Sequence, residues 1–216
     1  ADATRLVSMI LKELQLDPKR FPAKKIQGRI SDLKNSLIDP DTYLASAGPG
    51  PDAEVVAKVY PIYQRRLGAA NALDFDDLIM RTVQLFRSTP LVQASFCRRF
   101  RHVLVDEYQD TNHAQYVLVK LLSGGSGAAI KQPEQVAGEE LTPAELTVVG
   151  DSDQSIYAFR GATVRNIEEF EKDFPGARTI YLEQNYRSSG NILAAANAVI
   201  SHNQSRHKKK LWTDSG

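Results

Sequence analysis

Three short apolar runs, each followed by polar residues, constrain the fold of this chain more than any other feature. The runs cover residues 102–105, 146–149 and 179–182. Helical patterns cover residues 114–122, 164–174 and 192–200. Apolar strands that alternate with helices are typical of an α/β fold, in which helices cover both faces of a parallel sheet. Ligands bind such sheets beyond the carboxyl ends of the strands, so we expect the chemistry there.

The composition excludes several classes of protein. The chain has 216 residues, 27 of them basic and 26 acidic, and a formal charge of +1. Its one cysteine, Cys97, cannot form an intrachain disulfide, which favours a reducing compartment, and we expect a cytoplasmic protein. No apolar run approaches the roughly 20 residues of a membrane span, so we expect no membrane partner. The balanced charge excludes a histone-like polycation but allows a local basic groove for nucleic acid.

The first third of the chain has helical spacing. One helical pattern lies near residues 6–14 and another over 56–67, where we expect Pro61 to kink or interrupt the helix. Residues 47–51 are a Gly- and Pro-rich loop. We predict a further helix that is capped by Asp74. Its apolar face is predicted to carry Leu78, Ile79, Thr82, Leu85 and Phe86.

Three further stretches are polar or charged, and two of them have more than one interpretation. Residues 123–143 are rich in glycine and polar residues, and we predict a flexible surface insertion there. The basic stretches 19–34 and 206–210 are compatible with a solvated surface and with contacts to phosphate groups.

An acidic pair, Asp106 and Glu107, follows the first apolar run directly. Carboxylates at the end of a strand can hold a hard cation such as Mg²⁺ and accept a proton from an attacking water. The alternative is that the pair only caps a helix.

Four sequence runs together narrow these alternatives. They are Leu73–Leu78 (LDFDDL), Asp106–Asn112 (DEYQDTN), Val149–Ala162 (VGDSDQSIYAFRGA) and Leu182–Ser188 (LEQNYRS). In this order they resemble the motifs of the superfamily 1A DNA helicases, the UvrD/PcrA/Rep family. The resemblance implies an ATP-dependent 3′→5′ translocase and helicase that uses ATP and Mg²⁺. It also implies single-stranded and junction DNA as partners, a setting in DNA repair and possible contacts with repair proteins.

The resemblance also implies how the chain is divided. Residues 1–72 would be a helical accessory part of domain 1B, and 73–177 the second half of the RecA-like motor domain 1A, a partial parallel sheet with the P-loop NTPase fold. Residues 178–216 would begin the second RecA-like domain, 2A.

The family implies a role for each residue of the nucleotide site. Asp106 resembles the aspartate that holds Mg²⁺, and Glu107 the general base of hydrolysis. Gln154 stands where the family has a glutamine that senses the γ-phosphate. Arg187 matches an arginine that reaches the γ-phosphate as an arginine finger does, and Tyr186 matches a residue beside the nucleotide base. A surface salt bridge is the alternative for Arg187.

A second set of residues resembles the DNA-binding residues of the family. Phe75, Tyr157 and Phe159 match aromatic positions that stack on bases of single-stranded DNA, although the family usually has tryptophan at Phe159. Stacking binds any base, since every base has a π-face. Arg160 would link the DNA groove to the nucleotide site. The alternative is that the three aromatic residues belong to the core.

The 216 residues contain no Gly-x-x-x-x-Gly-Lys-[Ser/Thr] loop, which the family needs to hold ATP phosphates. We therefore expect an internal fragment of a larger helicase that needs the P-loop part of 1A, the rest of 2A and 2B. We expect the fragment alone to be inactive and to expose apolar sheet surface. Two alternatives stay open: a DNA-binding module without ATPase activity, and a helicase–nuclease subunit of the RecB/AddA type.

Overall fold

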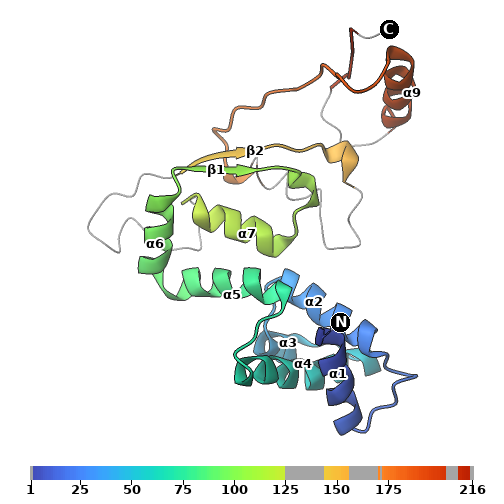
Figure 1. Cartoon of the computed structure of the whole chain (residues 1–216), viewed down its shortest axis with the longest axis vertical. Helices are drawn as coiled ribbons and strands as arrows, with labels where there is room; N and C mark the ends of the chain where they lie inside the picture. Colours follow the sequence, from blue (N-terminus) through green and yellow to red (C-terminus); the bar gives the residue numbers. More distant parts are fainter. Residues whose placement is uncertain (1, 125–143, 156–169, 171, 203–208, 215–216) are drawn as a thin grey trace.

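The computed structural model describes residues 2–124, 144–155, 170, 172–202 and 209–214. The described chain is elongated (Figure 1). A group of helices lies at one end, a small sheet with further helices lies in the middle, and the C-terminal helix lies at the other end. Mixed helices and a small parallel sheet agree with the α/β class predicted from the sequence.

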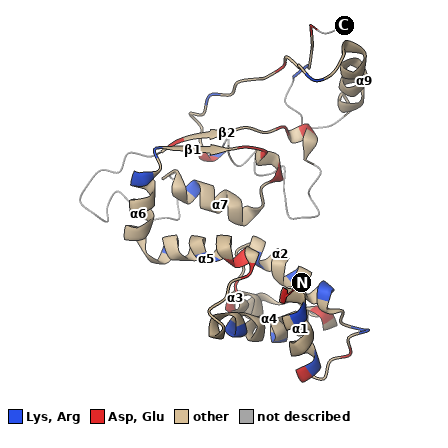
Figure 2. Ribbon diagram, viewed as in Figure 1, with Lys and Arg blue, Asp and Glu red and all other residues tan. Residues whose placement is uncertain are grey.

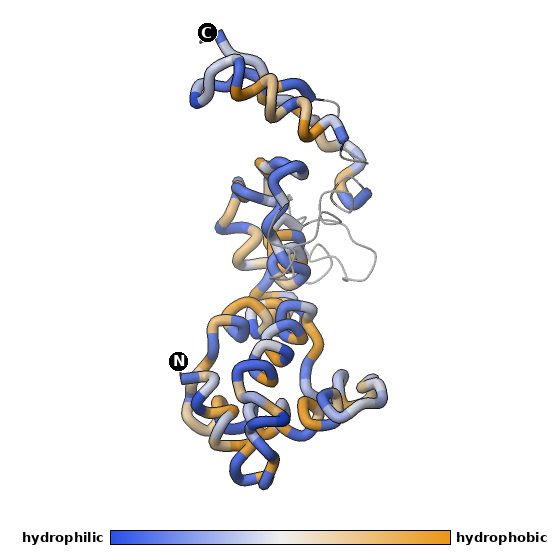
Figure 3. The backbone as a smooth tube through the Cα atoms, turned by 90° about the vertical axis from the view of Figure 1, so that its right-hand side faces the viewer, coloured by the Kyte–Doolittle hydropathy of each residue, from blue (hydrophilic) through white to orange (hydrophobic). Residues whose placement is uncertain are grey.

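The first third is helical, as predicted. It forms α1 (Asp2–Glu13), α2 (Ala23–Asn35), α3 (Pro40–Ser46) and α4 (Pro51–Ala69). Their apolar positions recur among hydrophilic ones along each helix (Figure 3), and the inward-facing ones form one core, with Ile10, Ile26 and Tyr60 at 0% exposure. The helices α1, α2 and α4 pack on one another, so this region has a core separate from that of the sheet.

Pro61 does not interrupt the helix in which it lies. Helix α4 continues through it from Pro51 to Ala69. A proline in a helix interior costs about 3 kcal/mol, because it lacks an N–H group and its ring clashes with the preceding turn. The buried side chains on either side of it, Val59, Tyr60 and Tyr63, stabilise the helix against that cost.

The middle region contains α5 (Phe75–Ser88), α6 (Pro90–Arg99) and α7 (His113–Leu122). Asp74 caps α5, as predicted. The predicted apolar face of α5 is confirmed at Phe86, which is buried, but is wrong at Leu78 and Leu85, which are exposed. The other buried residues of the helix are Asp77, Met80 and Val83. The difference arises because a buried polar residue, Asp77, replaces an apolar one on the inward stripe, which shifts that stripe relative to the apolar sequence pattern.

The sheet has two described strands, β1 (His102–Val105) and β2 (Glu145–Val148). They are parallel, with His102 opposite Glu145 and Val105 opposite Val148. Val105 and Val148 pack on the core between α5 and α7. Leu104 points to the other face and is 76% exposed. The prediction of a sheet covered on both faces is therefore wrong for the described residues, while the exposed apolar sheet surface agrees with expectation.

The third predicted strand, 179–182, does not pair in a ladder within the described chain. Ile180 is 65% and Leu182 75% exposed, because neither side chain packs in a described core. An isolated bridge joins Gln184 to Trp212 instead. The predicted helix after this segment is confirmed as α9 (Gly190–Ile200).

Parts of two predictions lie outside the described residues. They are the insertion beyond Gly124 and most of the helix predicted over 164–174. Among the described helices, none has the length and apolar character needed to cross a membrane.

Candidate functional site

The acidic pair lies at the carboxyl end of β1, where parallel sheets bind ligands. Asp106 and Glu107 are both exposed. They line a pocket of about 350 Å³ together with Val105, Asp110, Thr111 and other residues. Figure 2 shows acidic positions just beyond the ends of both strands. The pair therefore faces a solvent-accessible pocket, and among the described residues neither carboxylate forms an ion pair.

The backbone turns sharply at Glu107. This residue has φ 48° and ψ 45°, which is the left-handed region that residues other than glycine seldom adopt. The Glu107 N–H donates to Oδ1 of Asp106 at 2.9 Å. A sparsely populated backbone conformation costs of order 1–3 kcal/mol and persists only where the surroundings hold it. Here the turn carries the chain from β1 into a short 3₁₀ helix, Tyr108–Asp110.

The acidic pair and the second strand end are joined by hydrogen bonds. The Tyr108 N–H donates to the carbonyl of Val149 at 2.9 Å. The Asp151 N–H donates to Oε1 of Gln109, also at 2.9 Å. The structure thus brings together two runs of the sequence, 106–109 and 149–151, and the bonded residues Gln109 and Asp151 are 42 positions apart.

Gln154 lies in this second run, at the end of a short 3₁₀ helix, Ser152–Gln154. It is exposed, and its Nε2 donates to Oδ2 of Asp151 at 2.9 Å. The other carboxylate oxygen of Asp151 forms an ion pair with Lys209. Burial raises the pKa of Asp151, but the hydrogen bonds from Lys209 and Gln154 outweigh it, and the net shift is downward. The sequence motifs alone do not indicate Asp151 as the residue that holds Gln154.

The structure does not bring Tyr186 and Arg187 into this group. Tyr186 is 84% exposed, and its hydroxyl donates to Oε1 of Gln184 at 2.7 Å. Arg187 is exposed, and no ion pair joins it to another described residue. No hydrogen bond among the described residues links either side chain to Asp106 or Glu107.

Phe75 lies at the first position of α5 and is 89% exposed. A position in the described core is therefore excluded for this residue. Its helix begins with a reciprocal capping box, in which Asp74 Oδ1 accepts from the Asp77 N–H at 2.8 Å and the Asp77 carboxylate accepts from the Asp74 N–H. The start of α5, and with it the place of Phe75, is thus fixed by side-chain contacts.

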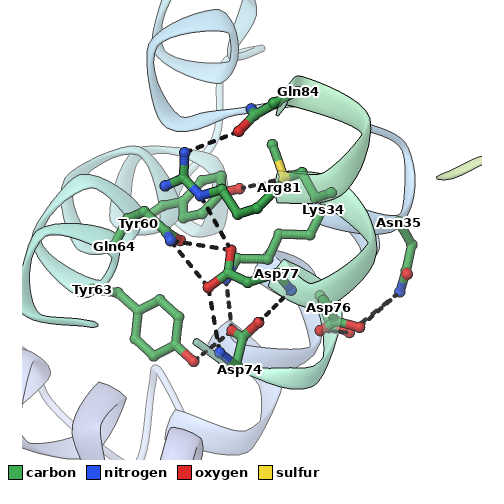
Figure 4. Close-up of polar contacts among 12 residues, drawn as sticks. Lys34, Asn35, Tyr60, Tyr63, Gln64, Asp74, Asp76, Asp77, Arg81 and Gln84 are labelled. Atoms are coloured by element: carbon green, nitrogen blue, oxygen red, sulfur yellow. Dashed lines mark hydrogen bonds and ion pairs between the residues drawn. The ribbon is translucent and has the colours of Figure 1, made fainter. Parts of the chain in front are cut away.

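A buried ion cluster holds this capping box (Figure 4). Lys34 of α2 is 0% exposed, and its Nζ lies 2.6 Å from Asp74 Oδ2 and 3.0 Å from Asp77 Oδ1. Tyr63 of α4 donates its hydroxyl to Asp74 Oδ2 at 2.7 Å. Burial raises the pKa of Asp74, but the hydrogen bonds from Lys34 and Tyr63 lower it by more. The cluster therefore fastens the first helices to α5.

Lys34 corrects one interpretation of the basic stretch 19–34. This residue is neither solvated nor available to a phosphate group, because two carboxylates enclose it. One sequence signal could have indicated that Lys34 pairs with Asp74 and Asp77. These two aspartates have the spacing of a capping box, which brings their carboxylates together at the start of a helix, and Lys34 lies on an amphipathic helix. Lys25, on the same helix, is exposed and pairs with Asp52.

Three predicted DNA-binding residues, Tyr157, Phe159 and Arg160, lie outside the described residues. In the described part of the chain, no cluster of three or more His, Cys, Asp or Glu side chains forms a ready metal site. The acidic pair nevertheless fits Mg²⁺, which is commonly held by one or two carboxylates, with water and substrate phosphates as the remaining ligands.

Comparison with known proteins shows the family of this chain. Residues 1–175 match the family described as UvrD/REP helicase N-terminal domain. The chain belongs to this family. It is 56% identical over its whole length to ATP-dependent DNA helicase UvrD1 of Mycobacterium tuberculosis (strain ATCC 25618 / H37Rv). It is 48% identical over 99% of its length to ATP-dependent DNA helicase PcrA of Bacillus subtilis (strain 168).

The match covers only part of those relatives. The chain spans 27% of the mycobacterial protein and 26% of the Bacillus protein. The UvrD/REP family membership confirms the resemblance on which the sequence analysis relied.

Proposed function

We propose that this chain is part of an ATP-dependent DNA helicase that moves 3′→5′ on single-stranded DNA. The observation that carries the proposal is the acidic pair at the end of β1, hydrogen-bonded through Gln109 to the turn that ends in Gln154. The UvrD/REP family and the names of the similar proteins support it. DNA repair, single-stranded and junction DNA, and a cytoplasmic location belong to the same proposal.

Each residue of the nucleotide site has a proposed task. Glu107 accepts the proton of the water that attacks the γ-phosphate, and Asp106 holds Mg²⁺. When bound, the ion neutralises charge on the phosphates. Gln154 contacts the γ-phosphate and, through Asp151, is held at the second strand end. Arg187 and Tyr186 approach the nucleotide from the segment after residue 178.

The proposed DNA contacts use aromatic stacking. Phe75 stands out from the start of α5, with 89% of its surface available to a base. Tyr157, Phe159 and Arg160 complete the proposed groove. In this proposal residues 1–72 belong to domain 1B, 73–177 to 1A and 178–216 to 2A.

The test is Glu107→Gln in the full-length protein that contains this segment. We expect the ATP turnover rate to fall by about 10²-fold or more, because a general base contributes about 10²–10⁴-fold. The affinity for ATP should stay within a few-fold, since the substitution preserves shape. Turnover at the wild-type rate would remove Glu107 from the role of base. Glu145→Gln, at the opposite end of the sheet, is the matched control and should retain full turnover.

A further inference from the structure

Gln109 is a polar residue in an unusual position. It is 1% exposed, although it lies in a short 3₁₀ helix directly after the exposed acidic pair. Both ends of its amide are used. Nε2 donates to Oε2 of Glu107 at 2.6 Å, and Oε1 accepts from the Asp151 N–H at 2.9 Å. One buried amide thus connects the proposed base to the turn that holds Gln154.

The turn from Gly150 to Ser155 encloses this amide closely. A Cβ atom at Gly150 would lie 2.6 Å from Oε1 of Gln109 and 3.2 Å from the backbone nitrogen of Tyr108. The Ser155 hydroxyl donates to the Gln109 carbonyl at 3.4 Å. A methyl group at position 150 would therefore displace the Gln109 amide from the turn, so the glycine allows the direct approach of turn and amide.

Glu107 needs such a support. Its carboxylate lies on an exposed residue, where a side chain with three rotatable bonds samples several rotamers. Its side-chain hydrogen bond to Gln109 selects one of them. Catalysis by a base requires it within hydrogen-bond reach of the attacking water, and a misplacement of about 1 Å can cost about 100-fold in rate.

We propose that Gln109 is a positioning residue that holds the carboxylate of Glu107 in a fixed position relative to the 150–155 turn. The inference rests on the proposed function, in which Glu107 is the base. Because the Gln109 amide bonds to both, the position of the turn determines the position of the Glu107 carboxylate. ATP hydrolysis is therefore fast only when the turn and the carboxylate are both correctly placed. Gln109 does not touch the reacting atoms in this arrangement.

The experiment compares Gln109→Met and Gly150→Ala in the full-length protein. The first removes both hydrogen bonds and keeps the length of the side chain, and the second pushes the amide away from the turn. We expect kcat for ATP hydrolysis on single-stranded DNA to fall by about 10- to 100-fold in both. KM for ATP should change less than about threefold, because no residue that would bind the nucleotide is altered.

The matched control is Gln93→Met. Gln93 is also a buried glutamine, 2% exposed, and its Nε2 donates to the carbonyl of Leu121 at 3.0 Å, in the same core but away from the acidic pair. The Gln93→Met variant should lose stability as Gln109→Met does, but its kcat for ATP hydrolysis should stay at the wild-type value. Hydrogen–deuterium exchange without nucleotide gives a second readout. The Asp151 amide should exchange faster in Gln109→Met and stay protected in Gln93→Met.

The combination with Glu107→Gln separates the two proposals. If Glu107 is the base and Gln109 acts through it, adding Gln109→Met to Glu107→Gln should lower kcat no further. Wild-type kcat in folded Gln109→Met and Gly150→Ala, beside an inactive Glu107→Gln, would overturn the inference and leave the proposed function standing. Wild-type turnover in Glu107→Gln would instead overturn the proposed role of Glu107 as the base, on which the inference rests. If circular dichroism shows either variant unfolded, Gln109→Glu replaces it in the test. This substitution keeps the acceptor for the Asp151 N–H but loses the donor to Glu107, and we expect the same fall in kcat.

Discussion

At the residue scale, burial decides what a charged side chain does. Lys34 and Lys25 lie on the same helix and look equivalent in the sequence. Lys25 forms an exposed pair with Asp52, whereas Lys34 is enclosed by Asp74 and Asp77. Exposed pairs contribute little to stability, while a buried charge that loses its partner is costly.

We predict that Lys34→Met destabilises the protein by about 3–5 kcal/mol at pH 7, since it removes the buried cation between Asp74 and Asp77 and leaves Asp77 only the more distant Arg81, at 3.8 Å. Lys25→Met is the matched control and should cost less than about 1 kcal/mol. Urea unfolding of both variants, followed by circular dichroism, measures the difference. Equal losses in the two variants would contradict a structural role for the buried cluster.

The same cluster predicts a pH dependence. The folded-state pKa of Asp74 lies below its ordinary value of 3.8, so its contribution to stability is present above that pH and is lost as the pH falls through the folded-state pKa. In Lys34→Met the pKa of Asp74 should rise, because burial remains and the Lys34 bond is gone. The deficit of this variant should therefore shrink between pH 7 and pH 4. A deficit that grows over this range would contradict the assignment.

Phe75 is the residue whose exposure has the most direct consequence. We predict that Phe75→Ala leaves the melting temperature unchanged, because 89% of the side chain is exposed. In the full-length protein it should weaken binding of single-stranded DNA by about 1–3 kcal/mol, or about 5- to 150-fold, by removing one stacking platform. Fluorescence anisotropy with a labelled oligonucleotide measures this. Leu85→Ala, also exposed on α5, should bind DNA normally, and equal losses in both would contradict stacking by Phe75.

At the scale of elements, packing outweighs local preference in α4. The helix passes through Pro61 and buries Val59, Tyr60 and Tyr63 beside it. Helix α5 gives a second case, since its inward stripe carries the buried Asp77 in place of an apolar residue. In both helices the tertiary partners, and not the helical pattern alone, determine which residues are buried.

We predict that Pro61→Ala stabilises the protein by about 2 kcal/mol. Relief of the helix penalty contributes about 3 kcal/mol, and the greater freedom of the unfolded chain returns up to about 1 kcal/mol. Thermal unfolding should show a higher midpoint. Pro51→Ala, at the first position of the same helix, is the control and should bring no such gain, because proline is well tolerated there. A lower midpoint for Pro61→Ala would show that the proline ring itself contributes to packing.

At the scale of the whole molecule, the described sheet has one covered and one open face. Val105 packs on the α5–α7 core, and Leu104 is 76% exposed on the opposite side. The acidic pair stands at the end of this half-covered sheet, and the 216 residues contain no Gly-x-x-x-x-Gly-Lys loop to hold phosphates. The proposed nucleotide site in these residues therefore contains the acidic pair but no Gly-x-x-x-x-Gly-Lys loop.

We predict that the isolated 216 residues bind Mg-ATP weakly or not at all. Calorimetric titration measures this directly, and micromolar affinity would contradict the prediction. The same titration of a longer protein that joins this segment to a P-loop is the control and should show tight binding. The comparison isolates the contribution of the phosphate loop, since the acidic pair is the same in both.

The sequence determined the class of the fold, the strand ends and the family. The apolar runs predicted the two strands that end near Asp106–Glu107 and Gly150–Asp151, and with them the place of the candidate site, because strand periodicity and strand-end chemistry are local properties. The third strand could not be predicted correctly in the same way, since a strand forms only where a neighbour pairs with its backbone. The sequence also could not show that Lys34 is buried or that Phe75 is exposed, because burial depends on what packs nearby.

Only the tertiary structure decided how the parts of the site are connected. Glu107 and Asp151 lie far apart in the sequence, and nothing in either run indicates that one amide joins them. Parallel pairing of β1 with β2 brings their ends together and leaves Gln109 buried between them. Local patterns determine which residues end a strand, whereas long-range packing determines which of those residues share a hydrogen bond.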